Sequence, residues 1–507
     1  MSDKITFKDI EEQLKRAQED PSLPPWVGLL LSMVWVMLKG LHDQLESTLE
    51  KLLVVTEERD LLKRKLYGSK RERTASGKPK SEGKKPPKVR DSDRPRLETT
   101  ELPEEIQEHA SPTTCPKCGG HELKDLKAPE EHIEYVMRPA SLVRVRHRLQ
   151  KCACLNGCTV TTAPAPLRVG EGGTMFGPSV YANIIASRAF DALPFSRQAD
   201  RWSRAGIPLR KTTIFDLFHR GNAELKPLYE ELLREVSQAP LIHADETPQP
   251  FTAEGKTRRG YFWVFAHERF SAYVFSKTRS GDVPHVYLKD TEGHIVVDGY
   301  TGYNSVTTPK GRKRVGCLAH MRRKFYEALV SDETVAPQIL SLIKEVYAVE
   351  GKIKTQGQQG TEAHLTARQK ESKPFMNQLK ALIDEHRPRT PPKSMLAKAL
   401  TYAHNQWSTL ILFLNDLTIP LDNNHAERLL RRIALARKTS LFIKPDLGES
   451  YAIAYSLVQS CRLCGVNPEI YLADVLLKVQ TTPQQQLRSL LPDRWKPPDG
   501  SSAVGWV

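Results

Sequence analysis

The stretch from Pro240 to Thr247, Pro-Leu-Ile-His-Ala-Asp-Glu-Thr, is a short apolar run that ends in two adjacent carboxylates. The stretch from His294 to Tyr300, His-Ile-Val-Val-Asp-Gly-Tyr, repeats this design and ends in Asp298. Apolar runs of this length are typical of buried strands. We therefore predict two neighbouring strands that present Asp245 and Asp298 at one edge of a sheet.

Two further strand patterns, Tyr261 to His267 and Ala272 to Ser276, lie between these acids. A strand, a hairpin and a second strand ending in an acid form the skeleton of an RNase H-like sheet. Two carboxylates held close together repel each other, and a divalent cation offsets that repulsion. Oxygen ligands favour magnesium over zinc. Two such ions can stabilise the attacking and leaving oxygens of a phosphodiester displacement.

A metal site of this kind calls for a third acid, and Glu427 is the best candidate. It lies in the stretch Leu-Asp-Asn-Asn-His-Ala-Glu-Arg-Leu-Leu-Arg-Arg, residues 421–432. Asp422, Asn423 or Asn424 can cap a helix there, which places Glu427 in its first turns. The competing interpretation is that each Asp is a turn residue and Glu427 a surface ion-pair partner. The same helix carries cations suited to DNA phosphates: Arg428, Arg431 and Arg432.

Five of the eight cysteines lie between Cys115 and Cys158, as Cys115-Pro-Lys-Cys118 and Cys152-Ala-Cys154-Leu-Asn-Gly-Cys158. Two short cysteine pairs at the ends of a small β unit supply the four ligands of a tetrahedral zinc ion. We predict Cys115, Cys118, Cys154 and Cys158 as ligands, with Cys152 as the alternative. The zinc either serves the fold alone or supports DNA contact as well. A second zinc site from Cys317, His320, Cys461 and Cys464 is chemically allowed but less favoured.

The remaining segments are mainly helical. Between Gly177 and Val236, the helices 195–203 and 212–220 flank the turn Ala205-Gly206-Ile207-Pro208, the outline of a helix-turn-helix. Many helical hairpins share this outline without binding DNA. Near the N-terminus, positions 41, 45, 48, 52, 55, 59, 62 and 66 step by fours and threes and are mostly Leu or Val. This seam fits a coiled coil or a helix packed on its own chain. Basic side chains surround the predicted helix-turn-helix turn at 205–208: Arg197, Arg201, Arg204, Arg210 and Lys211.

The net charge of +15 and the pI near 9.3 favour a polyanionic partner, for which nucleic acid is the simplest choice. No early apolar stretch indicates a secretory signal. The longest uncharged apolar run, Trp26 to Leu38, falls short of the ~20 residues that a membrane span requires. We therefore expect a cytoplasmic protein that is nucleoid-associated when bound to DNA and has no membrane partner.

The acid motifs resemble those of the insertion-sequence-66 family of bacterial transposases, in its large catalytic subunit. The resemblance rests on His243-Ala-Asp-Glu-Thr247, Asp298-Gly-Tyr-Thr-Gly-Tyr303, Gly316-Cys-Leu-Ala-His-Met-Arg-Arg-Lys-Phe325 and Asn424-His-Ala-Glu-Arg428. It extends nearly end to end, from Leu66-Tyr-Gly68 through the cysteine section to Gly465-Val-Asn-Pro468.

This resemblance implies a DDE transposase that cuts the ends of an insertion sequence and joins the freed 3′-hydroxyl to target DNA. Asp245, Asp298 and Glu427 would be its catalytic, metal-binding acids, with Mg²⁺ or Mn²⁺ as cofactor beside Zn²⁺. The partners would be element ends, target DNA, at least one further copy of the chain, and small accessory proteins encoded alongside. The alternatives are a nuclease on the same core that does not join DNA, and a catalytically silent zinc-containing DNA-binding regulator.

The expected fold class is multidomain α+β. The expected divisions are a helical section with a possible coiled coil at 1–68, a basic linker at 69–100, a zinc ribbon at 101–168, a helical DNA-binding section at 175–236, an RNase H-like α/β core at 237–445 with a helical insertion at about 332–414, and a C-terminal helical section and tail at 446–507.

Overall fold

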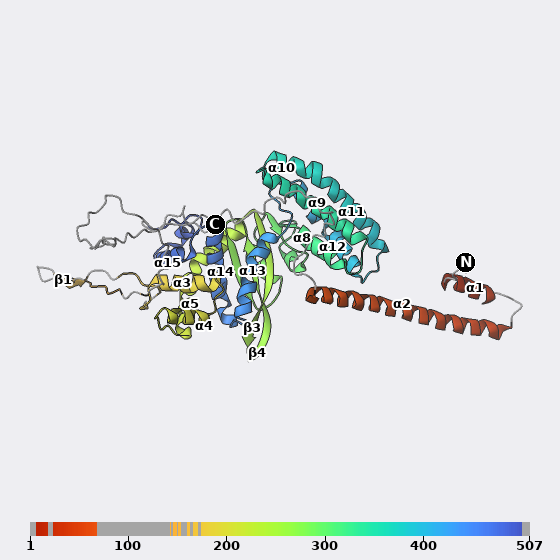
Figure 1. Cartoon of the computed structure of the whole chain (residues 1–507), viewed down its shortest axis with the longest axis horizontal. Coiled ribbons are helices and arrows are strands. Elements are labelled where there is room, and N and C mark those ends of the chain that lie inside the picture. The colour runs from red at the N-terminus through yellow and green to blue at the C-terminus, as the bar shows by residue number, and fades with distance from the viewer. Residues whose placement is uncertain are drawn as a thin grey trace, which may run out of the picture.

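The computed structural model describes residues 7–18, 24–67, 142, 145–149, 151–153, 160–162, 166–170 and 174–498. A mixed five-stranded sheet with many surrounding helices forms the centre of the molecule (Figure 1). This agrees with the mixed α and β composition that the sequence predicts. Nearly all of the predicted zinc ribbon, including Cys115, Cys118, Cys154 and Cys158, and the predicted linker at 69–100 lie outside the described residues.

The five strands are ordered β5-β4-β3-β6-β7. The first three in sequence, β3, β4 and β5, pair antiparallel, whereas β6 pairs parallel with β3 and β7 parallel with β6. The central strand β3 therefore joins an antiparallel half to a parallel half. The strand bounds are β3 Leu241–Ala253, β4 Lys256–Ala266, β5 Ser271–Ser276, β6 His294–Val296 and β7 Lys313–Val315.

The β3 strand is longer than its apolar run predicts, and it contains Pro248 and Pro250. A proline is tolerated in a strand where its missing N–H would face away from the ladder. Thr252, which has the same parity, donates its N–H outward to the carbonyl of Ile443 at 3.3 Å. Both prolines therefore lie at positions whose N–H would point to the outer edge, and the ladder to β4 continues to Ala253.

One hydrophobic core lies between the sheet and helices that come from before and after the strands in the sequence. At the outer strand β5, Ser456 and Ser460 of α14 accept the N–H groups of Tyr273 and Ser271 at 2.8 and 3.0 Å. These contacts satisfy backbone donors on a strand that would otherwise be an open edge. The helices of this core are α3 Pro178–Ala189, α4 Phe195–Arg204, α5 Lys211–Glu224, α6 Lys226–Gln238, α7 Asp282–Leu288, α13 Asn424–Thr439, α14 Gly448–Leu463 and α15 Pro468–Lys478, with short turns Thr301–Ser305, Pro445–Leu447 and Gln484–Leu490.

A second core joins the parallel edge of the sheet to the helices between the second and third acids. Val296 and Val315 of the strands β6 and β7 belong to it, so these helices are anchored on the sheet. Figure 1 shows them as a bundle beside the sheet. They are α8 Leu318–Ala328, α9 Val335–Thr355, α10 Glu362–Ala367, α11 Lys373–His386 and α12 Met395–Leu410, with single turns Arg368–Ser372, Arg387–Arg389 and Leu412–Leu414.

The N-terminal section consists of α1 Phe7–Gln18 and the 43-residue helix α2 Pro25–Tyr67. The α2 helix extends outward from the body (Figure 1). Seam residues such as Leu41, Leu52 and Leu62 are more than half exposed. Toward the C-terminal end of α2, the buried carboxylate of Glu57 accepts the N–H of Met395, at the start of α12, at 2.7 Å.

Two short strands in the cysteine section, β1 Lys151–Ala153 and β2 Val160–Thr162, pair antiparallel. Cys152 lies opposite Thr161 in this pairing, and the residues between the two strands are not described. Among the residues that the structure describes, no helix is long and apolar enough to cross a membrane.

Candidate active site

Asp245 lies in the central strand β3, where it pairs with Val264 of β4. Burial, together with the negative charges of Glu246, Asp298 and Glu427, raises the pKa of its carboxyl to about 8. A carboxyl whose pKa is raised this far by burial and neighbouring acids is a marker of a functional site. The charges of Asp298 and Glu427 act on Asp245 even though these residues lie 53 and 182 positions further along the chain.

Asp298 lies two residues beyond β6, in the turn that follows the strand. Its Oδ1 accepts the N–H of Tyr300 at 2.8 Å, which fixes the carboxylate relative to the strand end. A Cβ at Gly299 would lie 2.6 Å from Cε2 of Tyr402, so this turn fits against α12 only with glycine. Arg314 of β7 donates to the carbonyl of Tyr300 at 2.8 Å and secures the other side of the turn.

Glu427 lies in the first turns of α13, as the sequence predicts, and its N–H donates to the carbonyl of Asn423 at 3.2 Å. Its carboxylate faces two basic side chains of α8. His320 Nε2 is 3.6 Å from Oε1, and Arg323 Nη2 is 3.4 Å from Oε2. Burial lowers the pKa of His320, while Glu427 opposes this shift. The third acid is thus held by α8 on one side and adds its charge at Asp245 on the other.

Asn423 connects the third acid to the strand of the first. Its side chain is fully buried, and Nδ2 donates to the carbonyl of Ala244 at 2.8 Å. Because that amide group donates, Oδ1 is the acceptor for Nδ1–H of His243 at 2.9 Å. Of the three residues predicted as possible helix caps, Asp422 accepts the N–H of Asn424, whereas the side chain of Asn423 faces inward.

Glu246, next to Asp245, belongs to a separate network. Its side chain is 2% exposed and pairs with Arg279, while Tyr303 donates to Oε2 at 2.8 Å. Arg279 also lies over the ring of Tyr300, 4.1 Å from its centroid. These bonds explain how a buried carboxylate is accommodated one residue from the first acid. The sequence motifs did not single out Glu246, Arg279, Tyr303 or Arg323, and His320 was considered only for a second zinc site.

The sequence did contain a pattern that relates His320 to Arg323 of α8. His320 and Arg323 are three residues apart, which places them on one face of a helix. That spacing becomes informative only once α8 is known to lie beside the start of α13, where Leu318 donates its N–H to the carbonyl of Leu421 at 3.0 Å.

As they stand, the described residues contain no group of three His, Cys, Asp or Glu side chains placed to hold a metal ion. Cys317, His320, Cys461 and Cys464, considered above for a second zinc site, do not form such a group. Cys317 accepts the N–H of Asn423, and Cys464 donates to the carbonyl of Arg269. The three acids nevertheless offer hard oxygen ligands of the type that magnesium prefers. Burial and the neighbouring acids both disfavour the charged form of Asp245, and a bound cation would stabilise that form.

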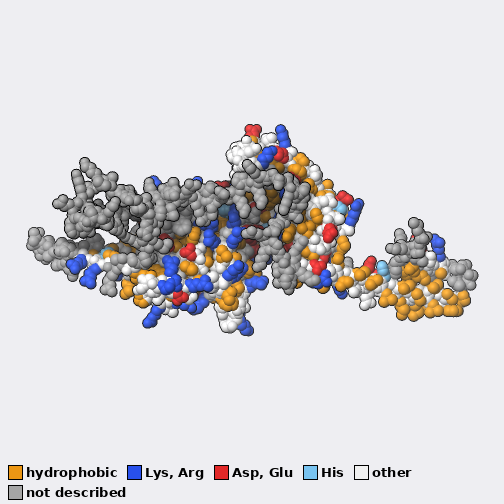
Figure 2. Space-filling view, in the orientation of Figure 1, with side chains coloured by type: hydrophobic (Ala, Val, Ile, Leu, Met, Phe, Trp, Pro, Cys, Tyr) orange, Lys and Arg blue, Asp and Glu red, His pale blue; other side chains and the backbone are white. Residues whose placement is uncertain are grey.

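The basic residues predicted for DNA contact lie in two regions, the hairpin of α4 and α5 and the helix α13. Arg197, Arg204, Arg210 and Lys211 are exposed on α4, α5 and the turn between them, and Arg201 is half-buried. Figure 2 shows Lys and Arg side chains gathered over α4, α5 and the tip of the β3–β4 hairpin. On α13, Arg428 and Arg431 are exposed, whereas Arg432 lies over the ring of Phe190 and joins α13 to α3.

Three family models match successive parts of the chain. The model described as transposase IS66 family matches residues 173–450, the IS66 C-terminal element matches 456–492, and the zinc-finger binding domain of transposase IS66 matches 112–156. The zinc-finger match includes Cys115, Cys118, Cys152 and Cys154 and ends before Cys158.

Relatives from Sinorhizobium fredii are similar over most of their length. The uncharacterized protein y4jD is 33% identical over 406 residues, which cover 75% of this chain and 78% of the relative. The uncharacterized protein y4hP is 27% identical over 90% of this chain and 84% of the relative. The family match over residues 173–450 spans both aspartates and the glutamate. By these matches and the sequence motifs alike, the chain belongs to the IS66 family of transposases.

Proposed function

We propose that this protein is a DDE transposase whose catalytic acids are Asp245, Asp298 and Glu427. The observation that carries the proposal is that β3, the end of β6 and the start of α13 bring these acids together, close enough for the charges of Asp298 and Glu427 to add to the effect of burial on the pKa of Asp245. Family membership supports DNA transposition as the process. The role of each acid in it is the proposal.

We also propose that the sheet is the RNase H-like core expected from the sequence. Its support is the strand order, in which a three-stranded antiparallel meander is extended by two parallel strands. The first two acids lie on or just after the adjacent strands β3 and β6, which is the placement that the motifs require. The helices at 335–410 lie between the second acid and the third, where the helical insertion was predicted.

Asp245 and Asp298 would hold the divalent cations, and Glu427 would complete the set. Bound Mg²⁺ or Mn²⁺ would neutralise charge on the phosphate and activate the attacking oxygen. In the first step, a water oxygen attacks phosphorus and the bond to the 3′ oxygen breaks, leaving a 3′-hydroxyl and a 5′-phosphate. In the second, that 3′-hydroxyl loses its proton and attacks a target phosphate, displacing the target's own 3′ oxygen.

The cysteine section would bind Zn²⁺ through Cys115, Cys118 and two of Cys152, Cys154 and Cys158. The basic face of α4 and α5, with Arg428 and Arg431, would contact DNA. The exposed seam of α2 supports a coiled coil with a second copy, because leucines such as Leu41, Leu52 and Leu62 are more than half exposed on the part of this chain that the structure describes. Pairing two element ends would use such a dimer.

The test uses a supercoiled plasmid that carries this gene with its native flanking DNA. Wild type, Asp298→Asn and Asp290→Asn are compared with magnesium and then with chelator. Asp290 is a suitable control because its side chain is 84% exposed and lies outside the site. We expect metal-dependent joined products from wild type and Asp290→Asn, and none from Asp298→Asn.

Cleavage without joining would favour the nuclease. Specific DNA binding without any reaction would favour the silent regulator. Retained cleavage by Asp298→Asn would contradict the assignment of this acid. Small proteins encoded beside the gene are added in a parallel reaction, since the family resemblance implies that they assist.

A further inference from the structure

The hairpin formed by β3 and β4 projects beyond the rest of the sheet. On one side, β5 pairs with β4 only as far as Tyr261, and on the other, β6 pairs with β3 only at residues 241–243. The pairing of β3 with β4 continues to Ala253 and Lys256. Residues 249–260 therefore form a two-stranded ribbon, closed by a tight turn in which Glu254 and Gly255 have positive φ angles of 52° and 71°.

The base of this ribbon is held in place by the segment after α13. Phe251 is 3% exposed and forms a bridge with Ile443, whose N–H donates to the carbonyl of Pro250 at 3.3 Å. Arg437 of α13 donates to the carbonyl of Pro248. The ribbon is thus a fixed arm whose base is attached to the helix that carries Glu427.

The far half of the ribbon is basic and exposed. Lys256, Arg258 and Arg259 all lie in a run of four exposed residues. Arg258 pairs with Glu254 at 2.9 Å, but the two side chains are 56% and 81% exposed, so solvent screens this pair strongly. The ribbon tip therefore keeps a net positive charge of two.

The outer face of α13 continues this charge toward the acids. The exposed residues of the helix include Arg428, Arg431, Leu435 and Lys438, at intervals of three, four and three. This spacing places them on one helical face. The stripe begins with the residue that follows Glu427 and ends beside the base of the ribbon.

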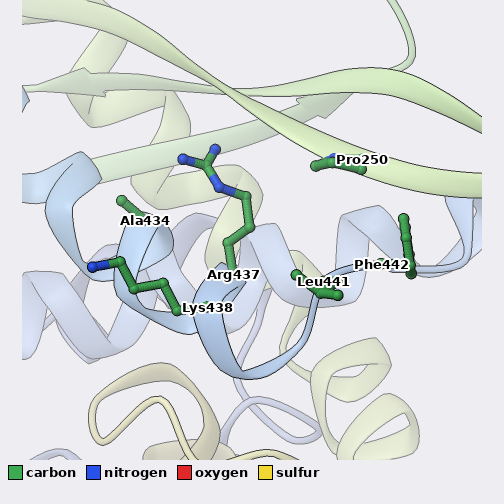
Figure 3. A pocket seen from close by; sticks show the side chains of 6 residues that line it. All are labelled: Pro250, Ala434, Arg437, Lys438, Leu441 and Phe442. Atoms are coloured by element: carbon green, nitrogen blue, oxygen red, sulfur yellow. The ribbon is translucent and has the colours of Figure 1, made fainter. Parts of the chain in front are cut away.

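A recess of about 440 Å³ lies between the stripe and the ribbon, and Figure 3 shows its lining side chains. Pro250 comes from the ribbon, and Lys438, Leu441 and Phe442 from the end of α13 and the segment after it. Among residues 174–498, the exposed large apolar side chains are Met175, Val286, Leu435, Leu441 and Phe442. Three of these five lie on this face, so it combines exposed apolar surface with a rim of cations, which is typical of an interaction site.

We propose that the ribbon and the outer face of α13 form one track that binds a DNA duplex as it leaves the catalytic acids. The inference rests on the proposed function and extends it to the ribbon. Exposed cations along the track match the phosphate backbone in charge, and Glu254 is the one acid within the ribbon itself. The apolar side chains of the recess would pack on sugar faces between the phosphate contacts.

The length of the track determines how many base pairs of DNA it can span. From Asp245 to Ala253 the strand rises by roughly 3.4 Å per residue, or about 27 Å in all. Along α13, the rise from Glu427 to Lys438 is roughly 16 Å at 1.5 Å per residue. At about 3.4 Å per base pair, the ribbon tip would lie about 8 base pairs from the phosphate at the acids.

The test measures binding of the full-length chain to a short linear duplex taken from the DNA that flanks this gene. The affinity is measured at salt concentrations between roughly 50 and 200 mM. The variant carries Lys256→Ala, Arg258→Ala and Arg259→Ala together. If all three cations contact phosphates, the slope of log affinity against log salt should fall by about 0.9 for each, or about 2.7 in total.

Arg389→Ala is the matched control. Like Arg258, Arg389 is an exposed arginine that pairs with a glutamate four residues earlier, at 3.3 Å from Glu385, but it lies in the helical bundle. Its slope should equal that of wild type. A second variant, Arg258→Lys with Arg259→Lys, should keep the wild-type slope because it keeps the charges. Thermal melting establishes that each variant is folded.

A wild-type slope in the triple alanine variant would overturn the track while leaving the proposed function intact. A wild-type slope together with a change in oligomeric mass would overturn it in favour of a contact with a second copy. Failure of wild type itself to bind any duplex would refute the proposed function as well.

Discussion

Replacing Asn423 with alanine tests whether the third acid is positioned through strand β3. The substitution removes the hydrogen bonds of Asn423 to Ala244 and His243, both inside the protein. It leaves one carbonyl and one ring N–H buried without partners, and each such group costs roughly 1–3 kcal/mol. We therefore expect the free energy of unfolding to fall by about 2–6 kcal/mol in urea titration followed by tryptophan fluorescence.

The catalytic effect should exceed what this loss of stability explains. Asn423 also accepts the N–H of Glu427 through its carbonyl, so a shift of the α13 start moves the third acid relative to Asp245. A displacement of about 1 Å in a catalytic group can cost roughly 100-fold in rate. We expect a loss of this size in DNA cleavage, measured at a temperature where the variant is still folded.

Asn222→Ala is the control, because Asn222 is equally buried but lies on α5. Its Nδ2 bonds only to the carbonyl of Phe218 at 2.7 Å, so its replacement should cost about 1 kcal/mol and leave cleavage unchanged. Wild-type cleavage by Asn423→Ala, or a loss of stability no greater than in the control, would refute the argument that Asn423 sets the position of Glu427.

Three further outcomes are expected. Arg323→Ala should lower the magnesium concentration needed for half-maximal cleavage several-fold, because the cation no longer competes for Glu427, and should change stability by less than ~0.5 kcal/mol. A magnesium titration of cleavage measures this, and an unchanged requirement would contradict it. Burial lowers the pKa of His219 from 6.5 to about 4, so the unfolded chain binds more protons than the folded chain between these values and stability is lost as the pH falls through them. After a discount for partial exposure, this loss in the free energy of unfolding is about 2 kcal/mol. Urea titrations at several pH values should find a smaller pH-dependent loss in His219→Phe. Gly293→Ala should destabilise by at least about 3 kcal/mol in the same titration, since its φ is +109° and the added Cβ would lie 2.3 Å from the carbonyl oxygen of Pro240; a loss below ~1 kcal/mol would show that the backbone relaxes there.

The central strands were predictable because burial leaves a direct mark on their sequence. Ile242, Ala244, Ile295 and Val296 are all fully buried, and strands covered on both faces read as continuous apolar runs. The helix that carries Glu427 was predictable from the polar residues at its start. The sequence also indicated the helices that flank Gly206, which the structure places at Phe195–Arg204 and Lys211–Glu224.

The ribbon and β7 were missed for physical reasons. Pro248 and Pro250 argue against a strand unless it is known that their missing N–H groups face an outer edge, and that depends on tertiary structure. The strand β7 has only three residues, two of them Lys313 and Arg314, so its sequence carries no apolar pattern. The pairing of Glu427 with α8 was missed because contacts between segments about a hundred residues apart leave no local signal.

The helices between the second and third acids do more than cover the sheet. Tyr347 of α9 donates to Asp422 at 2.8 Å, and Asp422 in turn accepts the first N–H of α13. The α8 helix holds Glu427 directly through Arg323. The third acid therefore takes its position from the helical bundle as well as from β3. Glu57 of α2 contacts Met395 of this bundle, and the bundle also contacts Glu427. The α2 helix and Glu427 are therefore attached to one packed unit. A change in how α2 associates therefore has a continuous route of packed helices to Glu427, one of the three acids proposed for catalysis.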